Sequence, residues 1–106
     1  MADPKAPPSG KYSSQGDTDS SWDGTFTYDS ITRAVSFTRN NAPVGPFPGK
    51  NQDLGNALNF TIDDGIEKAH FVSHTFAWKG QYAEYKGKWN IEGRETEDGW
   101  TATQTS

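Results

Sequence analysis

The chain has no cysteine and no long apolar run, and hydrophobic residues make up only 31% of its 106 residues. The absence of cysteine excludes disulfide bonds and thiolate metal sites. No stretch approaches the roughly 20 apolar residues that a membrane-spanning helix requires, and the first residues lack the apolar segment of a signal peptide. We therefore expect no membrane partner, and a cytoplasmic protein, or a secreted one whose leader has been removed.

An excess of basic residues is also lacking. The 14 acidic and 10 basic side chains give a formal net charge of −4, and no basic run offers the phosphate contacts that nucleic-acid binding requires. We therefore expect no nucleic-acid partner. The chain has no nucleophile elbow, glycine-rich phosphate loop or zinc motif, so the sequence predicts a protein without catalytic activity and without a cofactor.

Aromatic residues, by contrast, reach 13% and include four tryptophans. Because each aromatic side chain buries a large area, a core of Trp, Phe and Tyr can hold a small domain together. A domain of this size still buries a modest fraction of its surface and is only marginally stable alone. We therefore expect a homo-oligomer.

The apolar residues beyond the start of the chain alternate with a period of two, which is typical of strands. Residues 1–9 are polar and proline-rich and predict a flexible tail, followed by a single domain over 10–106. The candidate strands are 24–29, 34–38, 57–62, 67–78, 86–93 and 99–104. In the first three, the shared faces are Trp22, Phe26 and Tyr28; Val35 and Phe37; and Leu58, Phe60 and Ile62.

Between these strands, the Gly- and Pro-rich segment 40–55 predicts a long loop, or a strand broken by prolines. The whole pattern predicts an all-β fold, favouring a small antiparallel up-and-down β-barrel, of avidin-like type with about seven strands, or a sandwich. A helix over 63–79 is the competing prediction.

Two histidines, His70 and His74, lie four residues apart. On a helix they could hold a metal ion, but on a strand they are roughly 13 Å apart, which is too far for one ion. No third ligand is evident, so we expect no metal site. By strand parity, His70, Val72, His74 and Phe76 share a face with Trp78, and a small enzyme using the His70/His74 face remains an alternative.

Three tryptophans, Trp78, Trp89 and Trp100, recur at intervals of eleven residues, one on each late strand. If the inward faces of these strands meet in one barrel, the three indoles line the same interior. The interior of a small barrel is either filled by side chains or holds one small ligand, and the residue pattern leaves both open.

The late motifs ALNFTI, FAWKGQY, GKWNIEGRETED and GWTAT resemble, in order and spacing, the second half of avidin and streptavidin. Upstream, the start Gly10-Lys11-Tyr12 and the segment GTFTYDSITRAVSFT resemble the first three strands of that family. The resemblance implies a barrel in which tryptophans enclose the apolar body of biotin, while polar side chains from early strands hold its ureido group.

Residue by residue, the resemblance places Trp78, Trp89 and Trp100 in the cage. At the polar positions it places Ser14, Thr18, Arg39 and Asn41, where the family has Asn, Ser, Tyr and Ser. The final strand of the family, with its Asp, would lie beyond Ser106. Because each lost buried hydrogen bond is worth roughly 1–3 kcal/mol, the resemblance supports a Trp-lined cavity more strongly than biotin itself.

From both lines of reasoning we predict non-catalytic binding of a small molecule, biotin or biotin-like. The candidate ligand-binding residues are Trp78, Trp89, Trp100, Phe76, His74, Ser14, Thr18, Arg39 and Asn41, with Ser73 as a further polar contact. The main alternative is a lectin that binds a glycan. Exposed Trp faces would then stack on the sugar, and residues 40–56 and 94–98 would form the recognition loops.

Overall fold

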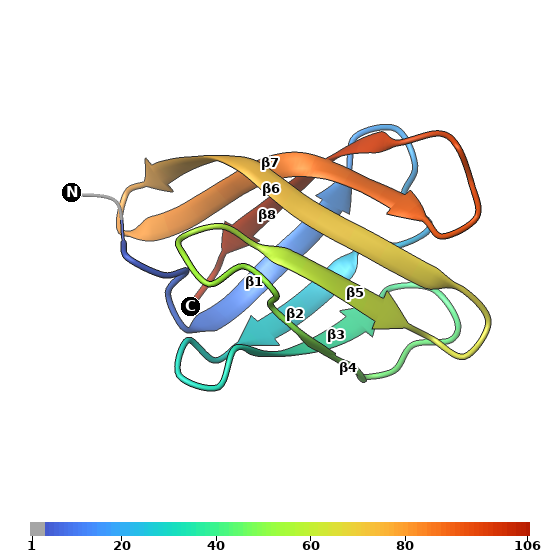
Figure 1. Cartoon of the computed structure of the whole chain (residues 1–106), viewed down its shortest axis with the longest axis horizontal. Coiled ribbons are helices and arrows are strands. Elements are labelled where there is room, and N and C mark those ends of the chain that lie inside the picture. The colour runs from blue at the N-terminus through green and yellow to red at the C-terminus, as the bar shows by residue number, and fades with distance from the viewer. Residues whose placement is uncertain (1–3) are drawn as a thin grey trace.

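The computed structural model describes residues 4–106, which form eight antiparallel strands in one up-and-down sheet that curves into a nearly closed barrel (Figure 1). The strands are β1 (Gly10–Gly16), β2 (Gly24–Tyr28), β3 (Ala34–Arg39), β4 (Phe47–Lys50), β5 (Asn59–Asp63), β6 (Lys68–Lys79), β7 (Tyr82–Ile91) and β8 (Asp98–Gln104). The predicted all-β barrel is confirmed, with eight strands in place of about seven. The alternative helix over 63–79 is wrong, because β6 occupies most of that range.

The inward faces predicted for the early strands are also confirmed. Buried residues alternate with exposed or half-buried ones along β2, β3 and β5. The aromatic and branched side chains of these strands are therefore buried in the core, as the period of two indicated.

The barrel closes along two seams of different kinds. The first seam is the ladder between β1 and β8, the first and last of the eight strands. The second lies between β4 and β5, which are the two ends of the sheet order and meet without a ladder. There, Gly49 lies so close to β5 that a Cβ atom would come within 2.6 Å of Cδ1 of Ile62. The side chain of Asn51 also bridges the seam, accepting from the Asn59 amide at 2.8 Å and donating to the Ala57 carbonyl at 3.0 Å.

The prediction that the last strand lies beyond Ser106 is wrong. The segment GWTATQ forms most of β8, which pairs with β1 through Ser14 and Ala102. Trp100 is therefore on the last strand of the barrel and not on the strand before it. The position that the avidin resemblance gives Trp100 is shifted by one strand.

A β-bulge in β6 overturns the predicted parity of that strand. The register with β7 shifts between Ser73 and Thr75, so that His74 is the extra residue. Before the bulge Phe71 and Ser73 are buried, whereas after it Phe76 is packed against the core. The prediction that His70 and Val72 share a face with Phe76 and Trp78 is therefore wrong.

Gly87 of β7 permits the close approach of the two strands at this bulge. A Cβ atom on Gly87 would lie 1.9 Å from the carbonyl oxygen of Val72 and 2.7 Å from Cα of Ser73. No side chain fits there, because the atoms in the way belong to the backbone. A glycine inside a strand often marks a bulge, so the sequence did contain this signal.

The core is a continuous cluster of aromatic rings, with Phe71 near its centre. The ring of Phe71 lies 5.2 to 6.2 Å, between centroids, from five other aromatic rings. These partners are Trp22, Phe37, Phe60, Trp89 and Trp100. Such offset and edge-on pairs add to the stabilisation that comes from area burial.

The two ends of the barrel differ, and we name them by their contents. The termini end holds the β2–β3, β4–β5 and β6–β7 connections together with residues 4–9 and the C-terminus (Figure 1), whereas the Arg39 end holds the other four loops. In the predicted tail, residues 1–3 lie outside the described residues, while Pro7 is buried and the Pro8 carbonyl accepts from Oη of Tyr12 at 2.6 Å. Among residues 4–106, no helix is long and apolar enough to cross a membrane.

Candidate functional site

Aromatic side chains fill the barrel interior where the sequence predicted a cage. Trp89 and Trp100 are 3% and 1% exposed, and both contact the central Phe71 ring. Nε1 of Trp100 donates to Oγ of Ser14 at 2.8 Å, so both polar atoms are satisfied within the core. The interior of a small barrel either is filled by side chains or holds a ligand. Trp89 and Trp100 belong to the filled part of this interior.

The polar candidates do not gather around one cavity. Ser14 lies in the core, whereas Thr18 is in the β1–β2 loop. Arg39 is 6% exposed and forms an ion pair with Asp64, with 2.5 Å between Nη1 and Oδ2. Asn41 is exposed and makes only long contacts, of 3.5 Å, to backbone carbonyls of the β1–β2 loop. The contact set that the avidin resemblance implied is therefore distributed over separate places.

At the termini end, a pocket of about 220 Å³ lies beside the bulge of β6. Its lining residues are Asn56, Ala57, Ser73, His74, Thr75, Phe76 and Tyr85. The candidates His74 and Phe76 meet here, and the ring of Trp78 packs edge-on against Phe76 at 5.1 Å. With Ser73, four of the predicted ligand-binding residues are thus brought together at this end, and we call this site the termini-end pocket.

The bulge is what produces this pocket. It returns Phe76 to the inner face after Ser73, and Tyr85 of β7 lies opposite Phe76. Oγ of Ser73 accepts from the Leu58 amide at 2.8 Å, which fixes the side chain and leaves its own proton to donate. The pocket therefore combines aromatic walls with fixed polar atoms, a common composition for small-molecule sites.

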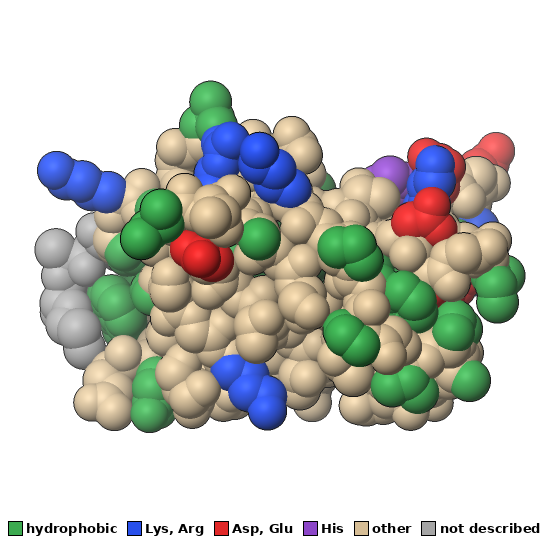
Figure 2. All heavy atoms as spheres, turned by 90° about the horizontal axis from the view of Figure 1, so that it is seen from below, with side chains coloured by type: hydrophobic (Ala, Val, Ile, Leu, Met, Phe, Trp, Pro, Cys, Tyr) green, Lys and Arg blue, Asp and Glu red, His purple; other side chains and the backbone are tan. Residues whose placement is uncertain are grey.

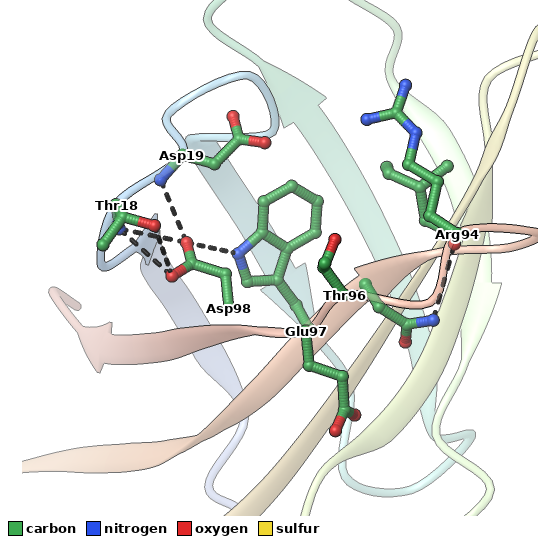
Figure 3. Close-up of a pocket in the computed structure, with 9 residues that line it drawn as sticks. Thr18, Asp19, Arg94, Thr96, Glu97 and Asp98 are labelled. Carbon is green, nitrogen blue, oxygen red and sulfur yellow. Dashed lines mark hydrogen bonds between the residues drawn. The ribbon is translucent and has the colours of Figure 1, made fainter.

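A second pocket, of about 200 Å³, lies at the Arg39 end between the β1–β2 and β7–β8 loops (Figure 3). Its lining residues are Thr18, Asp19, Trp89, Asn90, Ile91, Arg94, Thr96, Glu97 and Asp98. Two predicted residues, Thr18 and Trp89, meet here, together with most of the 94–98 turn. We call this the loop pocket.

Asp98 holds the two loops of the loop pocket together. Its carboxylate accepts from the amides of Thr18 and Asp19 and from Oγ1 of Thr18, at 2.8 to 3.2 Å, and from Nε1 of Trp89 at 3.2 Å. Partial burial of the carboxylate opposes its charge, but these hydrogen bonds outweigh that effect and lower the pKa of Asp98 to about 2. The carboxylate is saturated with donors, so its role is to position Trp89 and the loops.

We expect Asp98→Asn to lower the free energy of unfolding near pH 7 by about 1–3 kcal/mol, because an amide presents N–H to donors. A carboxyl with a depressed pKa stabilises the fold above its unfolded pKa of roughly 3.9, and this contribution is lost as the pH falls toward the folded value. The difference between wild type and variant should therefore shrink as the pH approaches 2. Urea titrations from pH 2 to 7 measure this difference in the free energy of unfolding. A difference that does not change with pH would contradict the stabilising role of the Asp98 carboxylate.

Around Arg39, a buried polar cluster closes the other side of this end. The guanidinium lies 4.0 Å above the Trp22 ring, and Nε1 of Trp22 donates to Oε1 of Glu67 at 2.7 Å. Oδ1 of Asp64 accepts from the amides of Ile66 and Glu67, both at 2.8 Å. Arg39, placed by the resemblance at a ligand-contacting position, is thus held by contacts within the protein.

The two histidines lie in different environments. His70 faces outward, with Nδ1 2.7 Å from Oγ1 of Thr61 and Nε2 3.5 Å from Oε1 of Glu92. His74 is the bulge residue and lines the termini-end pocket. The two histidines therefore do not share the face on which the enzyme alternative placed them.

Exposed apolar side chains do not form a single site. Figure 2 shows hydrophobic side chains near both ends of one face of the molecule. Among residues 4–106, the large exposed apolar side chains are Ile31, Val44, Leu54 and Ile66, and each belongs to a different loop. The pockets are therefore the stronger candidates for a binding function.

Fold and pockets together define a nearly closed, eight-stranded antiparallel barrel with a buried aromatic cluster and a pocket at each end. Comparison of the chain with protein-family models, with curated proteins and with solved structures found no match, and no family is identified. The fold therefore defines the class of protein, a nearly closed β-barrel, and the pockets are the candidate functional sites.

Sequence reasoning missed several residues of these pockets, chiefly Thr75 and Tyr85 at one end and Asp19 and Asn90 at the other. Tyr85 was missed because the bulge that places it opposite Phe76 was not recognised. The residues of the loop pocket come from the β1–β2 loop, from the end of β7 and from the segment that leads into β8. The pairing of β1 with β8 brings these segments together, although they lie far apart in sequence.

Proposed function

We propose that this protein is a non-catalytic binding barrel that takes a small, partly apolar ligand in the termini-end pocket. The observation that carries the proposal is the meeting of Phe76 and Tyr85 with Ser73 and His74 in one cavity at the mouth of the barrel. Barrel mouths are places where ligand pockets recur. Aromatic walls would bind an apolar ring, and the polar atoms would orient it.

The size of the pocket limits the ligand. A volume of about 220 Å³ is below the range of roughly 300–1,000 Å³ typical of drug-sized sites. It suits a single ring system, or one end of a longer molecule whose remainder stays in solvent. Biotin or a biotin-like compound, with its compact fused ring and extended tail, is the first ligand to test.

The burial of the tryptophans gives the lectin alternative little support. Trp22, Trp89 and Trp100 are at most 3% exposed, so they offer no open face for stacking on a sugar. Trp78 is partly buried and packs against Phe76. A pocket is therefore a more suitable binding site at the termini end than a flat aromatic surface.

Binding at the termini end can be followed through the indole N–H of Trp78. The chain has four tryptophans, so a ¹⁵N-labelled sample gives four indole signals, each assigned with a Trp→Phe variant. We expect biotin, or a member of a set of single-ring compounds, to shift the Trp78 signal and raise the melting temperature. If none of these compounds moves that signal at millimolar concentration, the proposal fails.

A matched pair of histidine variants tests the location. We expect His74→Gln to weaken binding of the ligand found by about three- to tenfold, which is the effect of one hydrogen bond. His70→Gln is the control, because His70 lies on the same strand but faces outward. Equal losses of affinity in the two variants would place the ligand elsewhere.

A further inference from the structure

We propose that copies of this chain associate head to tail, with the termini end of one copy against the Arg39 end of the next. The two ends lie at opposite ends of the long axis of the molecule, which measures 39 Å against 24 and 23 Å for the shorter axes (Figure 1). The small size of the domain predicted an oligomer but not the surfaces that meet. The charges and the exposed apolar side chains of the two ends indicate these surfaces.

The charges are divided unevenly between the two ends. The loops of the Arg39 end hold eight acidic residues and one basic residue, and these loops are residues 17–23, 40–46, 64–67 and 92–97. Two residues of each sign lie in the termini-end segments, which are residues 4–9, 29–33, 51–58, 80–81 and 105–106. The strand ends add two residues of each sign to the Arg39 end, but add only Lys50 and Lys79 to the termini end. Unlike ends therefore attract, whereas two Arg39 ends would repel.

The termini end presents apolar surface next to basic side chains. Ile31 and Leu54 are 90% and 82% exposed. They belong to the β2–β3 turn and the β4–β5 loop, which are neighbours because the Asn51 amide donates to the Arg33 carbonyl at 2.9 Å. Lys50, at the end of β4, is exposed and leads directly into this loop. An apolar contact with basic side chains around it can form here.

The Arg39 end presents apolar surface next to acidic side chains. Val44 and Ile66 are 49% and 81% exposed. Arg39 joins their loops, because its amide donates to the Val44 carbonyl at 2.8 Å and its guanidinium pairs with Asp64. Beside Ile66 the surface is hollowed by a pocket of about 350 Å³. Its other lining residues are Asp63, Gly65, Glu67, Lys68 and Glu92.

Both apolar pairs lie on the same side of the barrel. In Figure 2, which looks onto the side of β3 and β4, hydrophobic side chains lie near both ends and most acidic ones lie at the right. A shift along the long axis would therefore bring Ile31 and Leu54 of one copy onto Val44 and Ile66 of the next. Leu54 would enter the hollow beside Ile66, and Lys50 would face its carboxylates. Because this contact joins unlike surfaces and leaves one of each free, it extends into an open chain.

A second copy explains both ends of the molecule. A basic end with exposed apolar side chains could also dock on an anionic lipid surface. That partner would leave the exposed Val44 and Ile66, and the acidic loops around them, without a role. The observations therefore favour the second copy.

Sedimentation equilibrium measures the association. At about 1 mM protein and low salt, we expect the average mass of the wild type to rise past that of a dimer of the 11.7 kDa chain. It should fall toward one chain in about 0.5 M NaCl, because salt screens the attraction between the ends. A protein that stays monomeric at low salt, or stops at a dimer, would overturn the inference. Binding of such a monomer to phosphatidylserine vesicles would assign the basic end to a lipid surface instead.

Serine variants locate the two surfaces without changing the net charge. Ile31→Ser/Leu54→Ser and Val44→Ser/Ile66→Ser each remove the apolar side chains of one end, and we expect each to weaken association by about tenfold. Each variant keeps the other end intact, so an equimolar mixture should form a one-to-one dimer that does not extend. A mixture no heavier than the two variants alone would contradict head-to-tail contact.

A matched pair of lysine variants tests the charge. We expect Lys50→Gln to weaken association by about threefold, which is the usual effect of an exposed charge pair. Lys86→Gln loses the same charge from an exposed position on β7, away from both ends, and should leave association unchanged. Equal losses in the two variants would show that net charge alone controls association, and the assignment of the termini end would fail.

Discussion

Phe71→Ala is expected to lower the free energy of unfolding by about 3–5 kcal/mol, because it removes a large buried ring and leaves a cavity that the surrounding rings cannot fill. Phe71 is 1% exposed and contacts five aromatic rings. This loss is a large fraction of the roughly 5–15 kcal/mol that stabilises a natural domain. Urea titration monitored by tryptophan fluorescence measures it.

Val72→Ala is the matched control for this prediction. Val72 is the next residue on β6 and lies half-buried on the outer face, so its truncation should cost at most about 1 kcal/mol. Simple strand parity counted from Trp78 predicts the reverse, with Val72 inside and Phe71 outside. A larger loss in Val72→Ala than in Phe71→Ala would therefore contradict the bulge and the core built around it.

Asp64→Asn is expected to cost about 3–5 kcal/mol, because it leaves the buried guanidinium of Arg39 without its counter-charge. The two side chains are 6% and 1% exposed, and 2.5 Å separates Nη1 from Oδ2. A double-mutant cycle with Arg39→Met isolates the coupling between them. The double variant should be more stable than the sum of the two single losses predicts, since it buries no unpaired charge. Strict additivity would show that the pair is not coupled.

The same pair predicts a dependence on pH. Burial of Asp64 opposes its charged form, but the amides of Glu67 and Ile66 and the charge of Arg39 outweigh this and hold its pKa below the usual range. A carboxyl with a lowered pKa stabilises the fold above its unfolded pKa, and that stabilisation is lost as the pH falls through the folded value. Wild-type stability should therefore fall below about pH 4, and Asp64→Asn should lack this part of the fall.

Much of the fold was predictable from residue pattern. Alternation at Phe26 and Tyr28, at Val35 and Phe37, and at Phe60 placed three strands and their inward faces correctly. Period-two alternation is a local property, because successive side chains of any strand point to opposite faces. Segment 40–55 was predicted to be a long loop or a strand broken by prolines, because proline cannot donate to a ladder. It contains the short strand β4, which includes Pro48.

The candidate site was less predictable, because a single extra residue changes which side chains face inward. His74 was predicted beside His70 and Val72, yet the bulge leaves His70 on the outer surface and places His74 beside Phe76 at a pocket. Gly87 carried the signal, but its meaning depends on the Val72 carbonyl across the ladder. Local pattern cannot show such a contact.

The sequence by itself determined an all-β barrel with an aromatic core, since period, composition and turn residues are set residue by residue. Only the tertiary structure decided that Trp89 and Trp100 are packed core and not the walls of a central cavity. It also decided that Asp19 and Arg94 share a pocket. These outcomes depend on how strands distant in sequence pair and close, because closure sets both the space inside a barrel and the loops that meet at its ends.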